Sequence, residues 1–376
     1  MPCSALWRNN MNNIYLKNEE NAIFALRSLY QKYGYRPYKM SKFEEYDLYL
    51  KNKNFLVSDN IITFTDTDGK LMALKPDVTL SIIKNMKDKT GCVQKVYYNE
   101  NVYRVSKGTK AFKEIMQTGL ECIGNIDDYT IYEVIMLALE SLHTISKDYV
   151  MDISYLGIVS KVIDAYSCSD NIKKQIIKCV GEKNLSEIIS IEKSENIDLS
   201  KVKELISTYG TLSEVLPFLK SLDCVKEAEQ IEKIMRALEQ NGYKNKVRLD
   251  FSIISDMKYY NGFVFKGFIN GIPESVLSGG QYDNLMSKMG RSEMAIGFAV
   301  YLDMLERLSC NKSIYDIDAV ILYDDYADIN EINDAVKLMS QGGNTVTAQK
   351  SVPTGIRYKK LARLTKRGVK ILENNT

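Results

Sequence analysis

The sequence Asp256-Met-Lys-Tyr-Tyr-Asn-Gly-Phe-Val-Phe-Lys266, with Ser278-Gly-Gly-Gln-Tyr-Asp283 after it, combines adjacent tyrosines with glycines and short apolar runs. The apolar runs predict two strands, which begin near residues 262 and 275. Because the chain contains 25 tyrosines, the pair Tyr259 and Tyr260 would by itself be compatible with an ordinary core. The glycines that follow favour a turn and mark the segment as a candidate binding site.

The composition is that of an ordinary globular protein, with 45% hydrophobic and 26% charged residues. A length of 376 residues allows two or three domains and a large buried core. The formal net charge of +2 gives no strong field for a nucleic acid. We therefore expect no tRNA partner from charge alone.

Cysteine and histidine usage excludes several kinds of site. The seven cysteines are scattered, odd in number and without a C-x-x-C pair, which argues against a disulfide framework or a zinc site and fits a reducing cytoplasm. The single histidine, His143, excludes a histidine-based triad and a multi-histidine metal centre. No run approaches the roughly 18 apolar residues of a membrane span. The sequence predicts a cytoplasmic protein without metal or cofactor, not bound to membranes.

Hydrophobic periodicity outlines the secondary structure. An amphipathic helix is expected at 16–34, and a hairpin at 61–74 turns at Asp66-Thr-Asp-Gly69. Further strands are expected at 35–39, 93–98, 101–105, 118–123, 149–155 and 247–254, and helices at 76–87 and 127–147. Residues 295–303 start as a strand and pass into a helix that ends near residue 308.

The order of these elements predicts three parts. A strand-rich core of about residues 1–309 is interrupted by a helical insertion at about 157–243. After a polar linker at 310–315, residues 316–376 follow a β-α-β order, which is typical of a small α/β domain. The fold class is therefore α+β, an antiparallel sheet flanked by helices, with an insertion and a small C-terminal domain.

The opening segment resembles the histidine-recognition segment of class II histidyl-tRNA synthetases, R-G-L-D-Y-Y-x-x-x-V-F-E followed by G-G-R-Y-D. The resemblance covers about residues 14–308 and implies a class II aminoacyl-tRNA synthetase-like core. Four more segments match motifs of that family in the same order, namely Leu74-Lys-Pro-Asp-Val-Thr79 (L-R-P-E-G-T), Tyr103-Arg-Val-Ser106 (F-R-x-E), Gln117-Thr-Gly-Leu-Glu-Cys-Ile-Gly124 (Q-x-G-x-E-x-I-G) and Gly297-Phe-Ala-Val-Tyr-Leu-Asp-Met-Leu305 (G-F-A-x-G-L-E-R-L). The C-terminal domain looks truncated beside the family's anticodon-binding domain.

The resemblance implies a pocket for histidine. Asp77 would hold the α-ammonium of the ligand, and Arg104 matches an arginine that clamps a phosphate and the ligand carboxylate. The remaining candidate pocket residues are Thr79, Gln117, Glu121, Tyr259, Tyr260 and Gly280. Four of these residues have a simpler interpretation. Asp77 and Thr79 could cap a helix that begins at Pro76, and Gln117 and Glu121 could form the polar face of a half-exposed strand.

Other positions depart from the family. Ser255 stands where the family keeps its catalytic arginine, and Met304 where an arginine binds the γ-phosphate of ATP. Tyr301 occupies a glycine position beside the nucleotide, so a phenol is expected to fill that space. Losing one donor to transition-state charge typically costs about 10²–10³ in rate, so adenylation is disfavoured. Motif 1 carries Ser41 in place of a proline, and that motif serves the dimer interface of the family.

A synthetase-like core without catalytic arginines resembles the regulatory subunits of short-form ATP phosphoribosyltransferase. That resemblance implies a homodimer within a hetero-octamer, with a separate short catalytic subunit as partner. It also implies no catalytic activity of its own, and a role in the feedback inhibition of histidine biosynthesis by L-histidine. The sequence leaves open whether histidine binds the synthetase-like pocket or a subunit boundary.

Two other functions stay open on the sequence. A divergent, active histidyl-tRNA synthetase would need a new phosphate clamp from Lys107, Lys110, Lys258 or Arg291. It would also need tRNA contacts, for which only the run 357–367 is a candidate, and that run is more simply the solvated face of an amphipathic helix. The other alternative is a synthetase-like module that senses histidine for a different partner.

Overall fold

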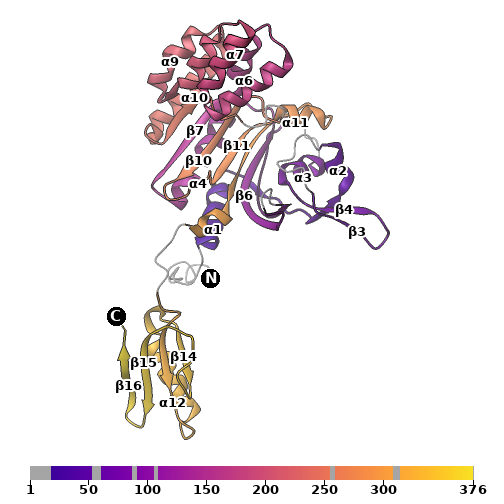
Figure 1. Cartoon of the computed structure of the whole chain (residues 1–376). Helices are drawn as coiled ribbons and strands as arrows, with labels where there is room; N and C mark the ends of the chain where they lie inside the picture. The colour runs from indigo at the N-terminus through magenta and orange to yellow at the C-terminus, as the bar shows by residue number, and fades with distance from the viewer. Residues whose placement is uncertain are drawn as a thin grey trace. The chain divides into compact units, whose positions relative to one another are not determined.

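The computed structural model describes residues 18–52, 61–86, 91–105, 109–254, 259–307 and 314–375. The chain forms two compact units (Figure 1). The larger unit spans Glu19–Leu308, and the smaller one contains Ser309–Thr376. Ser255 and Lys258, like Ser106 and Lys107, lie outside the described residues.

A nine-stranded sheet forms the centre of the larger unit. Its strands in spatial order are β1 (Arg36–Pro37), β5 (Gln94–Val105), β6 (Phe112–Gly124), β12 (Met294–Tyr301), β11 (Leu277–Gln281), β10 (Phe263–Ile269), β7 (Tyr149–Tyr155), β9 (Val247–Asp250) and β8 (Tyr209–Gly210). Neighbours pair antiparallel except β1 with β5 and β7 with β9. The sheet is therefore mainly antiparallel, as the sequence predicts.

Side chains alternate between the two faces of this sheet. On β10 and β12, Phe265 and Phe298 belong to the main core together with α1 (Asn18–Lys32) and α4 (Asp128–Ile145). The Tyr30 ring meets the Phe298 ring edge-on at 6.0 Å, and the Tyr30 hydroxyl lies 3.0 Å from Ser141 Oγ on α4. Because the strand period is two, the neighbouring residues of Phe265 and Phe298 face the opposite side. That side carries the candidate site.

A second layer covers part of that opposite face (Figure 1). It contains α2 (Tyr46–Lys51), α3 (Val78–Asn85) and a three-stranded sheet of β2 (Phe43–Glu45), β4 (Leu71–Leu74) and β3 (Thr63–Thr65). A buried ion pair joins the layer to β5, because Lys75 Nζ lies 2.9 Å from Glu100. The hairpin of β3 and β4 turns at Gly69, whose φ of +80° suits glycine.

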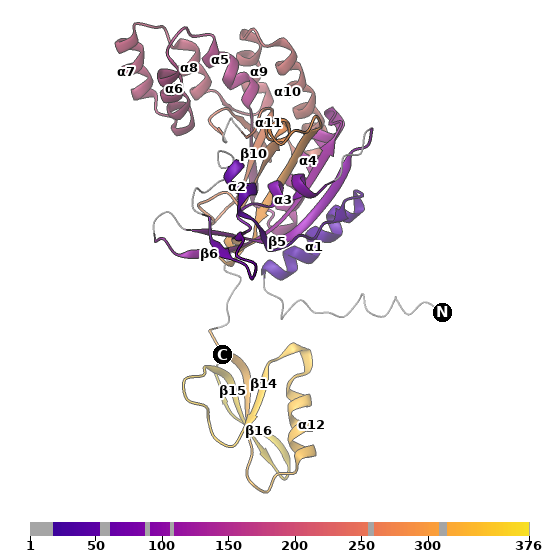
Figure 2. The ribbon, with the colours of Figure 1, turned by 90° about the vertical axis from the view of Figure 1, so that its right-hand side faces the viewer.

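Helices follow one another between β7 and β9 (Figure 2). They are α5 (Leu156–Asp164), α6 (Asp170–Glu182), α7 (Leu185–Glu195), α8 (Ser200–Ser207), α9 (Leu212–Ser221), α10 (Val225–Leu238) and η2 (Glu239–Tyr243). Local signals explain their ends: Ser169 caps α6, and Asn196 closes α7 with a φ of +52°. Among the described residues, no helix is both long and apolar enough to cross a membrane.

Three details of the larger unit differ from the prediction. The strands expected at 93–98 and 101–105 are one strand, β5, because it pairs with β6 without interruption from Gln94 to Val105. The glycines Gly279 and Gly280 do not form a turn, since both lie inside β11 between β10 and β12. The strand β12 ends at Tyr301 and is followed by a 3-10 helix, η3 (Leu302–Arg307), rather than an α-helix.

The smaller unit is a four-stranded sheet with one α-helix. Its strands lie in the order β14 (Val346–Gln349), β13 (Ile317–Leu322), β15 (Tyr358–Thr365) and β16 (Gly368–Asn374), with α12 (Ile329–Met339) between β13 and β14 in the chain. The run 357–367 was predicted to be a helix face, which is wrong. It forms β15, whose Leu361 and Ala362 are buried between its neighbours β13 and β16. Most of the expected linker, 310–315, lies outside the described residues.

Candidate functional site

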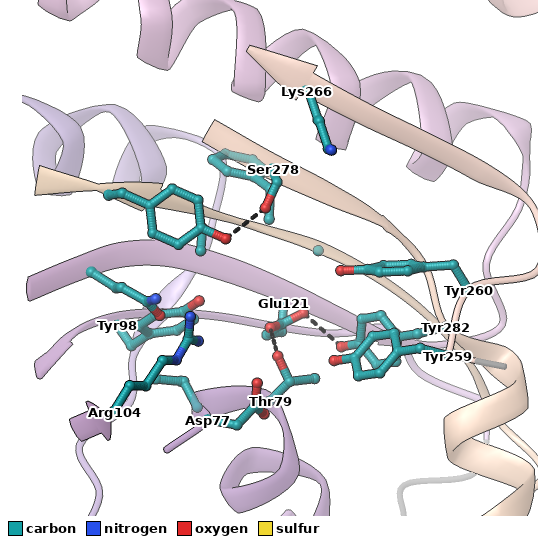
Figure 3. A pocket seen from close by; sticks show the side chains of 16 residues that line it. Asp77, Thr79, Tyr98, Arg104, Glu121, Tyr259, Tyr260, Lys266, Ser278 and Tyr282 are labelled. Atoms are coloured by element: carbon teal, nitrogen blue, oxygen red, sulfur yellow. Dashed lines mark hydrogen bonds between the residues drawn. The ribbon is translucent and has the colours of Figure 1, made fainter. Parts of the chain in front are cut away.

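A cavity of about 400 Å³ opens where α3 faces the sheet (Figure 3). Such a volume is typical of small-molecule sites. Its lining residues are Asp77, Val78, Thr79, Tyr98, Arg104, Gln117, Glu121, Tyr259, Tyr260, Lys266, Ser278, Tyr282, Gly297, Phe298, Ala299 and Tyr301. The strands β6, β12, β11 and β10 form its floor, and α3, β5 and the segment around Tyr259 form its walls.

The start of α3 supplies one polar wall. Asp77 is the N-cap of the helix, and its carboxylate accepts a hydrogen bond of 2.9 Å from the Leu80 amide. Arg104 Nε donates to the Pro76 carbonyl at 3.1 Å, which fixes the guanidinium beside that cap. The helix-cap interpretation of Asp77 is therefore confirmed, and the same side chain also lines the cavity. The helix begins at Val78 and not at Pro76, and the Thr79 hydroxyl donates to Glu121 instead of capping the helix. Burial raises the pKa of Asp77, which Arg104 partly offsets.

Glu121 lies at the centre of the site. It and Gln117 are 2% and 4% exposed, so the half-exposed strand face expected for them is wrong. Its carboxylate accepts hydrogen bonds from Thr79 Oγ1 at 2.8 Å and from the Tyr282 hydroxyl at 2.6 Å. Burial raises the pKa of Glu121 to about 8, although both hydrogen bonds act in the opposite direction. The side chain lies directly over Gly297, where an added Cβ would come within 1.8 Å of Glu121 Oε2. The glycine of the fourth motif thus makes room for the glutamate of the third.

Three tyrosines form an aromatic wall beside Glu121 (Figure 3). The ring centroids of Tyr259 and Tyr260 are 4.5 Å apart, and those of Tyr259 and Tyr282 are 5.9 Å apart. Burial raises the pKa of all three hydroxyls well above the ordinary value. They stay protonated near neutral pH, so each can donate a hydrogen bond as well as accept one. A planar, polar ring would find both stacking surfaces and hydrogen-bond partners here.

Two of the positions that depart from the synthetase motifs, Tyr301 and Met304, lie within the described residues. The Tyr301 hydroxyl lies 2.7 Å from Ser278 Oγ, so a hydrogen-bonded phenol stands on the floor. Met304 is half-buried and packs against the main core. An apolar thioether against a core supplies no charge for a phosphate. Ser255, the third lost position, lies outside the described residues.

The structure brings together nearly all of the predicted pocket residues. Asp77, Thr79, Arg104, Gln117, Glu121, Tyr259 and Tyr260 line the cavity, whereas Gly280 does not. Gly280 is packed beneath it, where an added Cβ would meet the Phe263 carbonyl oxygen at 2.6 Å and the Tyr260 ring at 2.8 Å. The sequence reasoning missed Tyr98, Lys266, Ser278 and Tyr282. Three of them end or belong to the opening segment, so its strand alternation held a usable signal.

The described ranges contain no group of three or more His, Cys, Asp or Glu side chains that could hold a metal ion. The polar groups around the cavity are two carboxyl groups, an amide, hydroxyls, one lysine and one guanidinium. Such a set suits a small organic ligand that carries both an ammonium and a carboxylate.

The antiparallel sheet, the helical layers and this cavity are those of a class II aminoacyl-tRNA synthetase-like core. The sequence model of histidyl-tRNA synthetase matches residues 12–305, and the chain belongs to that family. Within it, the chain is similar to the ATP phosphoribosyltransferase regulatory subunit of Clostridium kluyveri, with 28% identity over 77% of this chain and 78% of that protein.

Solved structures share the fold. A Bacillus halodurans C protein described as an ATP phosphoribosyltransferase regulatory subunit/histidyl-tRNA synthetase superposes with a TM-score of 0.71 at 23% identity, covering 88% of both chains. A chain of the ATP phosphoribosyl transferase (HisG:HisZ) complex from Thermotoga maritima gives a TM-score of 0.62 at 20% identity, covering 76% of this chain and 97% of that one.

Proposed function

We propose that the chain is a regulatory subunit of ATP phosphoribosyltransferase that acts in the first step of histidine biosynthesis and senses L-histidine in the cavity around Glu121. It has no catalytic activity of its own. It works in the cytoplasm as a homodimer within a hetero-octamer, together with a separate short catalytic subunit. The named relatives support the regulatory role, because they are regulatory subunits rather than synthetases.

The observation that carries the proposal is the pairing of an intact amino-acid half of the cavity with an altered nucleotide half. Thr79 is hydrogen-bonded to Glu121, and Asp77 lies beside them at the start of α3, where it caps the helix. By contrast, the Tyr301 hydroxyl is hydrogen-bonded to Ser278 on the floor, and the half-buried Met304 packs against the core. A site that binds an amino acid without activating it suits a sensor. A divergent synthetase is disfavoured for the same reason.

Histidine matches the donors and acceptors of the cavity. Its ammonium suits Asp77, its carboxylate suits Arg104, and its imidazole suits the aromatic wall of Tyr259 and Tyr282. Feedback follows if the inhibited assembly binds histidine more tightly than the active one, because a ligand shifts an equilibrium only by its differential affinity.

Reconstitution tests the function. The short catalytic subunit of the same organism is assayed for phosphoribosyl-ATP formation, alone and with this chain, and ATP–pyrophosphate exchange with histidine is measured in parallel. We expect formation of the product to depend on this chain and exchange to be absent. Histidine-dependent exchange would overturn the proposal in favour of a synthetase. No change in the activity of the catalytic subunit would favour a sensor with another partner.

A further inference from the structure

Lys266 is a cation of the cavity that the motifs do not account for. It lies on β10, with Ser278 directly across on β11 and Asp152 directly across on β7. Figure 3 shows its side chain reaching into the cavity from the side opposite Asp77, Thr79 and Arg104. The two cations, Lys266 on the β10 floor and Arg104 on the β5 wall, thus line the same cavity from different sides.

The acidic groups around Lys266 have other partners. Asp152, its neighbour in the sheet, accepts a hydrogen bond of 2.8 Å from Arg248 Nε. Glu121 is bonded to Thr79 and Tyr282, and Asp77 to the Leu80 amide. No carboxylate of the described residues forms an ion pair with Lys266. Lys266 is partly buried and lines the cavity, so a ligand anion in the cavity would find its ammonium without a competing carboxylate.

The charge balance of the cavity points the same way. Burial raises the pKa of Glu121 to about 8, so this carboxyl group is mostly protonated near neutral pH. Arg104 and Lys266 then outweigh the negative charge of Asp77. The histidyl-tRNA synthetase motif has a glutamate where Lys266 stands, so one wall of the cavity has the opposite charge.

We propose that Lys266 adds a second cation to the ligand cavity, across from Arg104, and that it makes the cavity specific for amino acids whose α-carboxylate is free and ionised. Amides, esters and reduced analogues of the same amino acid are then rejected. This inference rests on the proposed histidine-sensing function. It identifies the α-carboxylate as the part of the ligand that determines binding.

The test compares two ligands across variants by isothermal titration calorimetry. Histidinol carries a CH₂OH group where histidine carries its carboxylate. We expect the wild-type protein to prefer histidine by about 100-fold, and Lys266→Met to reduce that preference about tenfold or more while histidinol affinity stays within about twofold. Lys266→Arg keeps the preference. Lys266→Glu weakens histidine binding further and strengthens histidinol binding, because the charge is reversed.

Controls separate a local effect from a folding defect. Lys360→Met changes a half-buried strand lysine of the smaller unit and leaves both affinities unchanged. Circular dichroism melting identifies any variant that unfolds, and Lys266→Arg and Lys266→Glu decide the question if Lys266→Met does not fold. An unchanged histidine preference in folded Lys266→Met or Lys266→Glu overturns the inference but leaves the sensor standing. Wild-type protein and its complex that bind no histidine overturn the sensor itself.

Discussion

Tyr282 donates a hydrogen bond of 2.6 Å to Glu121 across 161 residues of sequence. It joins the last strands of the larger unit to the middle of β6, and Thr79 completes the arrangement from α3 at 2.8 Å. Three segments that are far apart in the chain therefore meet at one carboxyl group. Displacing any of them alters the acidity of Glu121 and the shape of the cavity.

Glu121 should make stability depend on pH. Its pKa of about 8 in the folded state exceeds its usual value of 4.5, so the folded chain binds more protons between those values. The free energy of unfolding then falls as pH rises from 5 to 8, by at most about 1.4 kcal/mol per pH unit. Glu121→Gln keeps the hydrogen-bonding shape and removes this dependence.

Urea unfolding of wild type and Glu121→Gln at pH 5, 6.5 and 8 measures the difference. The variant should gain stability relative to wild type at each step upward in pH. A difference that stays constant from pH 5 to 8 would show that Glu121 ionises normally in the folded protein.

Gly297 should tolerate no side chain. An added Cβ would approach Glu121 Oε2 to 1.8 Å and the Leu120 carbonyl oxygen to 2.5 Å, and the backbone on both sides is held in the sheet. We expect Gly297→Ala to lower the free energy of unfolding by about 2–3 kcal/mol or more. Gly181→Ala is the matched control: it lies in α6 and meets only Ile254 at 4.0 Å, so it should stabilise by about 0.5–1 kcal/mol. Equal effects of the two changes would contradict the geometry.

The buried ion pair of Lys75 and Glu100 should be costly to break. The Lys75 side chain is fully buried, Glu100 is 12% exposed, and burial lowers the pKa of Lys75. Lys75→Met leaves Glu100 without its cation and should destabilise by about 3 kcal/mol. Lys75→Met with Glu100→Gln should recover part of that loss, since no uncompensated charge remains. Urea denaturation of the single and double variants measures their free energies of unfolding. A double variant less stable than Lys75→Met would refute the explanation.

Tyr301 should keep nucleotides out of the cavity. Its ring lies on the floor and its hydroxyl is bonded to Ser278 at 2.7 Å. We expect no binding of a fluorescent ATP analogue by wild type or by Tyr301→Phe, which keeps the ring. Tyr301→Gly combined with Met304→Arg restores space and a cation, and should gain weak binding. Tight binding by the wild-type protein would contradict this role of Tyr301.

The sequence predicted most of the site because its residues lie within short motifs. Asp77, Arg104 and Glu121 each belong to a run whose order and spacing resemble one family, and the cavity brings these runs together. Lys266 and Tyr282 were missed although they are in or beside the opening segment. The role of Lys266 depends on which face of β10 meets the cavity, and a one-residue change of strand phase would turn its side chain away. Tyr282 directly follows β11, and its role depends on where that strand ends.

The errors in the fold have physical causes. The Gly279-Gly280 pair suggests a turn, yet the glycines serve close packing in a strand, since a Cβ at Gly279 would meet Phe298 Cβ at 2.4 Å. The run 357–367 has charged residues at spacings that fit a helix as well as a strand. Pairing with β13 and β16 makes the run a strand, and the sequence of the run alone does not reveal that pairing.

Histidine inhibition of the reconstituted complex tests the central claim most directly. Phosphoribosyl-ATP formation is measured against histidine concentration with wild-type chain and with Asp77→Asn, which keeps the helix cap to the Leu80 amide but removes the charge. The account predicts that both chains activate the catalytic subunit equally and that Asp77→Asn needs at least about tenfold more histidine for inhibition. Equal inhibition of the two complexes would contradict it and place the histidine site elsewhere in the assembly.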